Sequence, residues 1–142
     1  MIFQFHRGRT LLGKLIRVFS SGSYDHVSIR SGKYIYEATH IGVVKVPYKE
    51  WNSDTVHLSL EVKSKYEKEV VRWLNKQIGK GYDYSGLLSF ISIITKPVKG
   101  KWYCSELGMV AYSKLMGQDG DIDNQKISPY LLYKIIQLGR YA

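Results

Sequence analysis

The sequence has few cysteines, few acidic residues and no long apolar run, and each shortage excludes a class of protein. The single cysteine, Cys104, excludes an intrachain disulfide and any metal site made of cysteines alone. The longest apolar stretch, residues 87–94, is interrupted by serines and is too short to span a bilayer. The first residues lack the basic lead and apolar core of a secretory signal. We therefore expect a protein that starts out in the cytoplasm, with release by another route left open.

Acidic residues are outnumbered by basic ones, and the imbalance bears on possible partners. The chain has 21 Lys and Arg against 12 Asp and Glu, a formal net charge of +9. Such a surface attracts anions, which leaves open a peripheral contact with an anionic membrane or wall polymer. The basic residues are spread along the chain, and no signature of a nucleic-acid module is present, so no specific nucleic-acid partner is expected.

What the chain does have is a composition suited to one folded domain. Hydrophobic residues make up 44% of 142 residues, which is enough for a single globular domain over residues 1–142. Twelve tyrosines and three tryptophans provide large side chains with one polar group each. Such side chains suit both a core and a groove for an extended substrate.

The apolar spacing predicts strands first and helices later, with one early helix at residues 9–19. Alternating residues predict strands at 26–30, 33–38, 42–48 and 55–62, and their short connections predict an antiparallel meander. Helical spacing predicts helices at 66–78, 85–94, 103–116 and 130–138, with a polar loop at 119–124. The sequence therefore predicts an α+β fold, in which a small antiparallel sheet packs against helices.

Several residues predict where helices begin and end. Ser64 and Glu67 have the spacing of a capping box, and Gly79 or Gly81 can end the helix that follows. Ser128 followed by Pro129 predicts the start of the last helix.

Cys104 lies where the chain is expected to enter a helix. Unpaired N–H groups and the positive end of the helix dipole favour a thiolate there. The same N–H groups can stabilise the oxyanion of an acyl-transfer intermediate. A lone cysteine is equally the pattern of an inert buried side chain, so Cys104 alone does not identify a nucleophile.

His26 is the best candidate for a base that activates Cys104. It begins a predicted strand directly after a Gly/Ser loop, from which its ring can reach a cleft. His6, His40 and His57 are the alternatives, but His57 alternates to the solvent side of its strand and His40 lies in a turn.

Glu37 lies on the strand that pairs with the His26 strand through a turn at Ser31 and Gly32. In that hairpin its carboxylate can orient the His26 ring, as the third member of a catalytic triad does. A register slip of one residue would turn Glu37 away, which leaves a solvated surface carboxylate as the alternative.

The sequence gives little support to metal, cofactor or nucleotide chemistry. The histidines have no paired spacing, and the acidic loop at residues 119–124 lacks the terminal glutamate of an EF-hand. No glycine-rich phosphate loop follows a strand. We therefore expect neither a metal nor a cofactor.

These residues resemble the permuted papain-like enzymes related to NlpC-type cell-wall hydrolases, in particular the YiiX-like branch. In that arrangement the histidine precedes a polar residue and then the cysteine, as His26, Glu37 and Cys104 do here. The resemblance rests on short blocks at residues 24–29, 36–38, 81–87, 103–107 and 127–132, in family order over most of the chain.

The resemblance implies a circularly permuted papain-like core with Cys104 at a helix N-terminus facing His26. It implies that Cys104 attacks an acyl carbonyl, that His26 acts as base and then acid, and that Glu37 orients His26. Tyr24 and Tyr82 are then candidates for lining the substrate groove.

Three function classes follow from the sequence. The first is a cysteine amidase or peptidase that cleaves a peptide or cell-wall peptide through a thioester. The second is a lipid acyltransferase or thioesterase on the same fold, suggested by the basic and aromatic composition. The third is a non-catalytic basic domain that binds a polymer.

Overall fold

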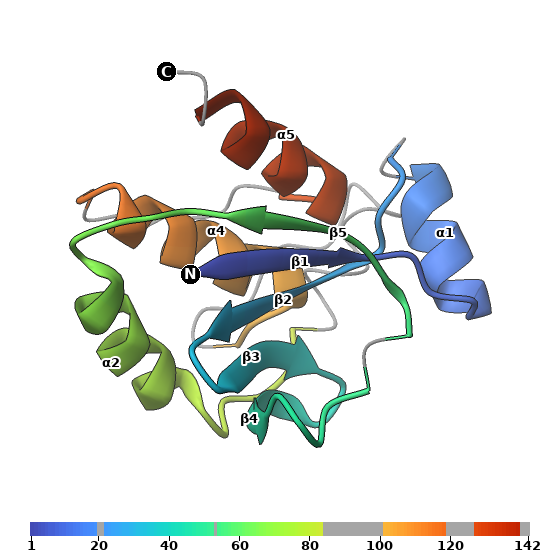
Figure 1. The fold of residues 1–142 in the computed structure, drawn as a ribbon. Coiled ribbons are helices and arrows are strands. Elements are labelled where there is room, and N and C mark those ends of the chain that lie inside the picture. The colour runs from blue at the N-terminus through green and yellow to red at the C-terminus, as the bar shows by residue number, and fades with distance from the viewer. Residues whose placement is uncertain (20–21, 53, 84–100, 119–126, 140–142) are drawn as a thin grey trace.

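A computed structural model shows a five-stranded antiparallel sheet with helices packed against it (Figure 1). It describes residues 1–19, 22–52, 54–83, 101–118 and 127–139. The strands are β1 (Ile2–His6), β2 (His26–Ser31), β3 (Tyr34–Thr39), β4 (Gly42–Pro47) and β5 (Val56–Glu61). The helices are α1 (Leu11–Phe19), α2 (Glu67–Gln77), α4 (Cys104–Leu115) and α5 (Pro129–Gly139). The α+β class predicted from the sequence is confirmed.

The strand order corrects the predicted meander. The order is β4-β3-β2-β1-β5, so β5 pairs with β1 at the far edge instead of following β4. The sequence reading missed β1, a five-residue interior strand that lies between β2 and β5. Phe3 and Phe5 explain its position, because both are fully buried and lie opposite apolar residues of β2 and β5.

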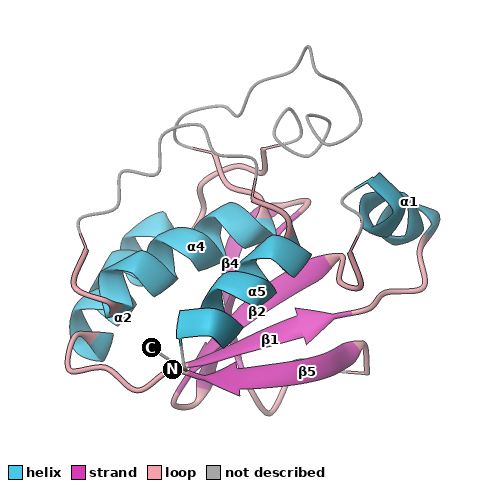
Figure 2. Ribbon diagram, turned by 90° about the horizontal axis from the view of Figure 1, so that it is seen from above, coloured by secondary structure: helices cyan, strands magenta, loops and turns pink. Residues whose placement is uncertain are grey.

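The core lies between one face of the sheet and the helices α2, α4 and α5 (Figure 2). Phe3 stacks edge-on against Tyr112 of α4, with ring centroids 6.2 Å apart, and Phe5 does the same with Tyr133 of α5 at 5.7 Å. Helix α1 lies apart from these three helices, beyond the end of the sheet at which β1 ends (Figure 2).

The predicted helix ends are partly confirmed. Ser128 caps α5, because its Oγ accepts the N–H of Leu131 at 3.0 Å, and Gly79 follows α2 with a φ of 83°. The capping box predicted for α2 is wrong. The carboxylate of Glu67 instead accepts bonds from the hydroxyl of Ser31 and the amine of Met1, while Ser64 bonds the N–H of Tyr66.

The sheet order forces a long connection between β4 and β5, which we call the crossover strap (residues 48–55, of which 53 is outside the described residues). The strap leads from β4, at one edge of the sheet, to β5, at the other (Figure 1). On the way it contacts β1 and β3: the ring of Trp51 meets His6, and its indole N–H meets Glu37. The helix predicted at 85–94 and the loop predicted at 119–124 lie outside the described residues.

Candidate active site

Cys104 is the first residue of α4 and is 5% exposed. The chain enters the helix from an extended Tyr103, whose N–H is accepted by the carboxylate of Glu106 at 3.3 Å. The hydroxyl of Tyr103 donates to the carbonyl of Ile127 at 2.7 Å and holds this entry against the segment before α5. First-turn N–H groups have no partner within their own helix, so this position offers donors to an oxyanion.

His26 and Glu37 meet across the β2–β3 hairpin. The pairing of Ile29 with Tyr36 puts Glu37 on the same face of the sheet as His26, in a diagonal position. His26 Nε2 lies 2.8 Å from Glu37 Oε2, and the two side chains are 27% and 13% exposed. Because Glu37 occupies Nε2, Nδ1 is the ring nitrogen left for another partner.

That other partner is Cys104. Burial by itself lowers the pKa of His26, but the charge of Cys104, a hydrogen bond with Cys104 and the bond with Glu37 outweigh it and raise that pKa well above 6.5. The structure therefore brings together the three residues proposed from the sequence, with the imidazole between sulfur and carboxylate. A raised imidazole pKa beside a cysteine favours a thiolate–imidazolium pair.

Glu37 is held ionised by a second donor that the sequence analysis did not identify. The indole N–H of Trp51, in the crossover strap, donates to Glu37 Oε1 at 3.0 Å. Burial alone raises the pKa of Glu37, but the bonds from His26 and Trp51 and the positive charge of His26 bring it below 4.5. Each carboxylate oxygen therefore has its own donor, which fixes the direction in which Glu37 faces His26.

His6, one of the competing histidines, lies directly behind His26 instead of replacing it. The two residues are paired in the β1–β2 register, and their ring centroids are 4.9 Å apart. Both nitrogens of His6 are engaged, Nδ1 with the hydroxyl of Thr55 and Nε2 with that of Ser28, each at 2.9 Å. Burial and the charge of His26 lower the pKa of His6 to about 3, so it is a neutral neighbour of the His26 imidazole.

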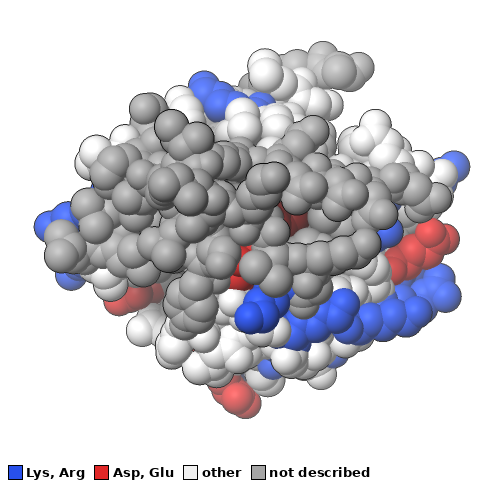
Figure 3. All heavy atoms as spheres, turned by 180° about the vertical axis from the view of Figure 1, so that it is seen from behind, with Lys and Arg blue, Asp and Glu red and all other residues white. Residues whose placement is uncertain are grey.

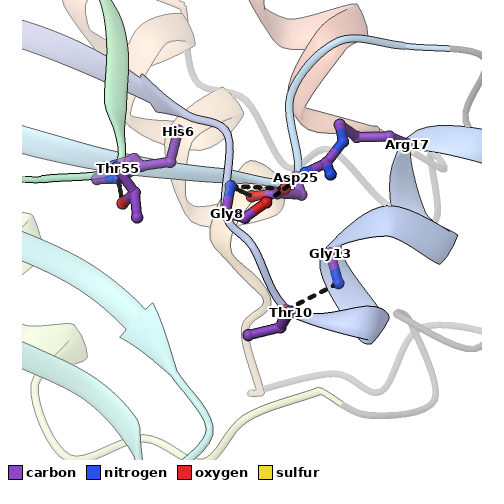
Figure 4. Close-up of polar contacts among 7 residues, drawn as sticks. All are labelled: His6, Gly8, Thr10, Gly13, Arg17, Asp25 and Thr55. Carbon is purple, nitrogen blue, oxygen red and sulfur yellow. Dashed lines mark hydrogen bonds and ion pairs between the residues drawn. The ribbon is translucent and has the colours of Figure 1, made fainter.

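Asp25 fixes the loop that leads into His26 (Figure 4). Its carboxylate accepts the N–H of Gly8 and pairs with Arg17 of α1. Helix α1 passes close to it, because a Cβ on Gly13 would lie 2.8 Å from Asp25 Oδ2. This cluster ties the chain after β1, helix α1 and the start of β2 together, one residue before His26.

Tyr24 and Tyr82, the candidates for lining a groove, lie in different places. Tyr24 is 6% exposed and packs among the rings of Phe5, Tyr130 and Tyr133. Tyr82 is half-buried and forms a parallel bridge with Trp102, two residues before Cys104. Their roles in substrate binding remain predictions.

A second buried carboxyl lies two residues after Cys104. Burial raises the pKa of Glu106 to about 8, with a contribution from the nearby Asp83, against the opposing effect of the Tyr103 N–H. Glu106 therefore holds a proton near neutral pH and does not add a negative charge beside Cys104.

The sequence analysis did not identify Trp51, Asp25 and Arg17 as neighbours of the His26–Glu37 pair, and it considered His6 only as an alternative to His26. His6 could be noticed in the sequence because it is one of four histidines. No local sequence pattern indicates that a tryptophan in a loop would reach Glu37. Among the described residues, no group of three or more His, Cys, Asp or Glu side chains is placed to hold a metal ion. Within the same ranges, no helix has the length and apolar character needed to cross a membrane.

Comparisons with protein-family models, with curated proteins and with solved structures each gave no match. The functional argument therefore rests on the chain's own residues and their geometry.

Proposed function

We propose that this protein is a cysteine hydrolase of papain-like chemistry that cleaves an amide bond through a thioester on Cys104. One observation carries the proposal: the His26 ring bonds Glu37 at 2.8 Å and also interacts with Cys104, the first residue of α4. A buried lone cysteine needs no histidine and no oriented carboxylate, whereas a nucleophile needs both.

The steps follow from these positions. The Cys104 thiolate attacks the acyl carbonyl carbon, and N–H groups of the first turn of α4 stabilise the oxyanion. The His26 imidazolium gives its proton to the leaving amine as the C–N bond breaks, leaving an acyl thioester. His26 then takes a proton from water, whose oxygen attacks the thioester, and the carboxylic acid leaves as the thiolate returns.

The proposal includes the permuted papain-like core suggested by the resemblance. The order His26, Glu37, Cys104 along the chain supports it, as does a cysteine-bearing helix that packs on β2 and β3. The proposed substrates are peptides or cell-wall peptides. Transfer of the same thioester to a lipid is the competing outcome, because the three residues do not dictate whether water or another nucleophile accepts the acyl group.

The decisive experiment is mass spectrometry of the intact protein after incubation with peptidoglycan fragments, acyl lipids and simple amides. We expect an acyl adduct on Cys104 and none on Cys104→Ala. Glu37→Gln should keep the adduct but form it about 10- to 100-fold more slowly, since the ring loses its charged orienting partner.

Alkylation tests the nucleophile without a substrate. Iodoacetamide should modify Cys104 rapidly at pH 6, because His26 stabilises the thiolate there, and the rate should fall in His26→Ala. A Cys104 that reacts at pH 6 no faster in the wild type than in His26→Ala would contradict the proposal.

A further inference from the structure

Three tyrosine rings form a cluster next to the proposed catalytic pair, which we call the tyrosine platform (Tyr24, Tyr130 and Tyr133). Tyr24 lies 5.2 Å from Tyr133 and 6.3 Å from Tyr130 between ring centroids, and the last two lie 5.9 Å apart. Tyr24 precedes β2, whereas Tyr130 and Tyr133 lie in the first turns of α5. Two separate parts of the chain therefore bring three phenols to one place.

The phenol groups of the platform also influence one another, and a guanidinium acts on them. Burial raises the pKa of Tyr24, the neighbouring Tyr133 and Tyr130 raise it further, and Arg7 lowers it. The positive charge of Arg7 therefore favours negative charge at the Tyr24 hydroxyl. Arg7 itself is exposed and therefore accessible to a ligand.

A second cation flanks the platform on α5. The Nζ atom of Lys134 lies 5.6 Å from the Tyr130 ring centroid and 5.5 Å from that of Tyr133, and the residue is exposed. The adjacent carboxylate, Asp25, is already neutralised by Arg17 and by the N–H of Gly8. The platform therefore combines hydroxyl donors with two exposed cations.

The platform lies at the catalytic end of the sheet. Tyr24 comes two residues before His26, and Arg7 follows His6, which is paired with His26 in the β1–β2 register. A group bound there would lie at the same end of the sheet as His26.

We propose that the tyrosine platform, with Arg7 and Lys134, binds an oxyanion group of the substrate, a phosphate or a carboxylate. This inference rests on the proposed function, because it assigns a substrate class to that site. Phenol hydroxyls and cations are donors without acceptor competition from a free carboxylate, and bonds from cations to oxyanions are stronger than neutral ones. The oxyanion is the carboxylate of a peptide or the phosphate of a lipid or wall polymer.

Positive charge is not confined to this end of the molecule, so the test needs a control cation. Figure 3 shows a band of Lys and Arg side chains on the rear face. Lys68, an exposed residue of α2, provides a matched change of charge away from the platform.

The experiment compares three p-nitrophenyl esters of similar length, made from butyric, succinic and 3-phosphonopropionic acid. We expect the esters with a free carboxylate or phosphonate to have a kcat/KM about 10-fold above that of the neutral butyrate, mainly through KM. The ratio of the two anionic esters distinguishes a carboxylate-bearing from a phosphate-bearing substrate. The preference should weaken at high salt.

The variants locate the effect. Arg7→Gln combined with Lys134→Gln should abolish the preference, and Tyr133→Phe should reduce it while keeping the ring. Lys68→Gln, which lies outside the platform, should leave both the preference and the hydrolysis of the butyrate unchanged. Equal hydrolysis of the three esters by the wild type, or an equal loss in Lys68→Gln, would overturn the inference.

A binding measurement separates this inference from the proposed function. We would titrate Cys104→Ala with succinate and with inorganic phosphate and follow the NMR signals of the tyrosine rings. The platform signals should shift in Cys104→Ala, and they should not shift when Arg7→Gln and Lys134→Gln are added to it. Absence of any shift overturns the platform. Absence of an acyl adduct on Cys104, with the shifts present, overturns the hydrolase and leaves an anion-binding surface.

Discussion

At the scale of single residues, the candidate site is defined by how charge is distributed over a few buried groups. His26 carries a positive charge between two partners, His6 beside it stays neutral, and Glu106 holds a proton. Burial favours the neutral form of all three groups, and it prevails for His6 and Glu106. For His26, the interactions with Cys104 and Glu37 outweigh burial and raise the pKa.

NMR titration of the histidine rings tests this distribution. Because its pKa is raised, His26 should remain an imidazolium well above pH 6.5, and His6, with a pKa of about 3, should stay neutral from pH 5 upward. In Cys104→Ala the pKa of His26 should fall, since the interactions with Cys104 are lost. The stabilisation from the charged His26 is full below pH 6.5 and is lost as the pH rises through the raised value.

An unchanged His26 titration in Cys104→Ala would show that sulfur and imidazole do not interact. Glu37→Gln is the matched comparison, because it lowers the same pKa by removing the other partner. The two variants together apportion the shift between Cys104 and Glu37.

Glu106 gives a prediction on stability with the opposite sign. The fold favours its protonated form, with a pKa of about 8 against 4.5 in the unfolded chain, so the wild type loses stability as the pH rises from about 4.5 to 8. Glu106→Gln keeps an acceptor for the Tyr103 N–H without that loss. Urea unfolding should show the variant about 2 kcal/mol more stable than the wild type at pH 8 and equal to it at pH 4.5.

At the scale of elements, the site depends on close contact between α4, α5 and β2. Gly108 of α4 makes this possible, because a Cβ there would lie 2.6 Å from Leu132 Cδ2 and 3.4 Å from Val27 Cγ1. Leu132 and Val27 are both buried, so neither has free space into which to move. Glycine is a poor helix former, but at this position the close contact with Leu132 leaves no room for a larger residue.

Gly108→Ala should therefore destabilise the protein by about 1–2 kcal/mol in urea unfolding, even though alanine is the better helix former. The double variant Gly108→Ala/Leu132→Val tests the cause, since a shorter residue 132 relieves the overlap. The loss should be smaller than the sum of the two single changes. A fully additive loss would mean that Gly108 and Leu132 are not in contact.

Most elements could be predicted from the sequence, but their order in the sheet could not. Helical and alternating spacings are local properties, so α1, α4, α5 and the strands β2 to β5 were identified from the residues themselves. Residues 2–6 were missed although Phe3, Gln4, Phe5 and His6 alternate apolar and polar as a strand does, because the segment is only five residues long. Pairing of β1 with β5 is a long-range contact, which no local pattern records.

The same limit applies to the candidate site. The residues Cys104, His26 and Glu37 could be proposed because helix entry, strand start and hairpin geometry are local features. Trp51 reaches Glu37 only through the crossover strap, and the strap exists because β4 and β5 lie at opposite edges of the sheet.

At the scale of the whole molecule, β1 is one of the three interior strands of the sheet. It has a neighbour on each side, and its inner side chains meet α4 and α5. The outer edge of β4 is partly covered by the chain after α2, through bonds between Val43 and residues 79 and 80. The two edges of the sheet are therefore unequal, and the middle is the most protected region.

Hydrogen exchange should reveal this ranking. We expect the amides of the interior strands β1 and β2 to exchange most slowly, at the rate set by global unfolding, and those on the outer side of β5 to exchange much faster. Mass spectrometry of peptic fragments under native conditions would measure both. Exchange in β1 as fast as on the outer side of β5 would contradict the observed strand order.

The crossover strap also limits how the chain can change in length. Four interstrand steps separate β4 from β5, about 19 Å in all, whereas eight linking residues span at most about 28 Å when fully extended. Since the strap also turns to deliver Trp51, little slack is left. Deletion of two residues leaves about 21 Å of reach and should pull the indole off Glu37 before it breaks the sheet, so natural variation in this segment should add residues and not remove them.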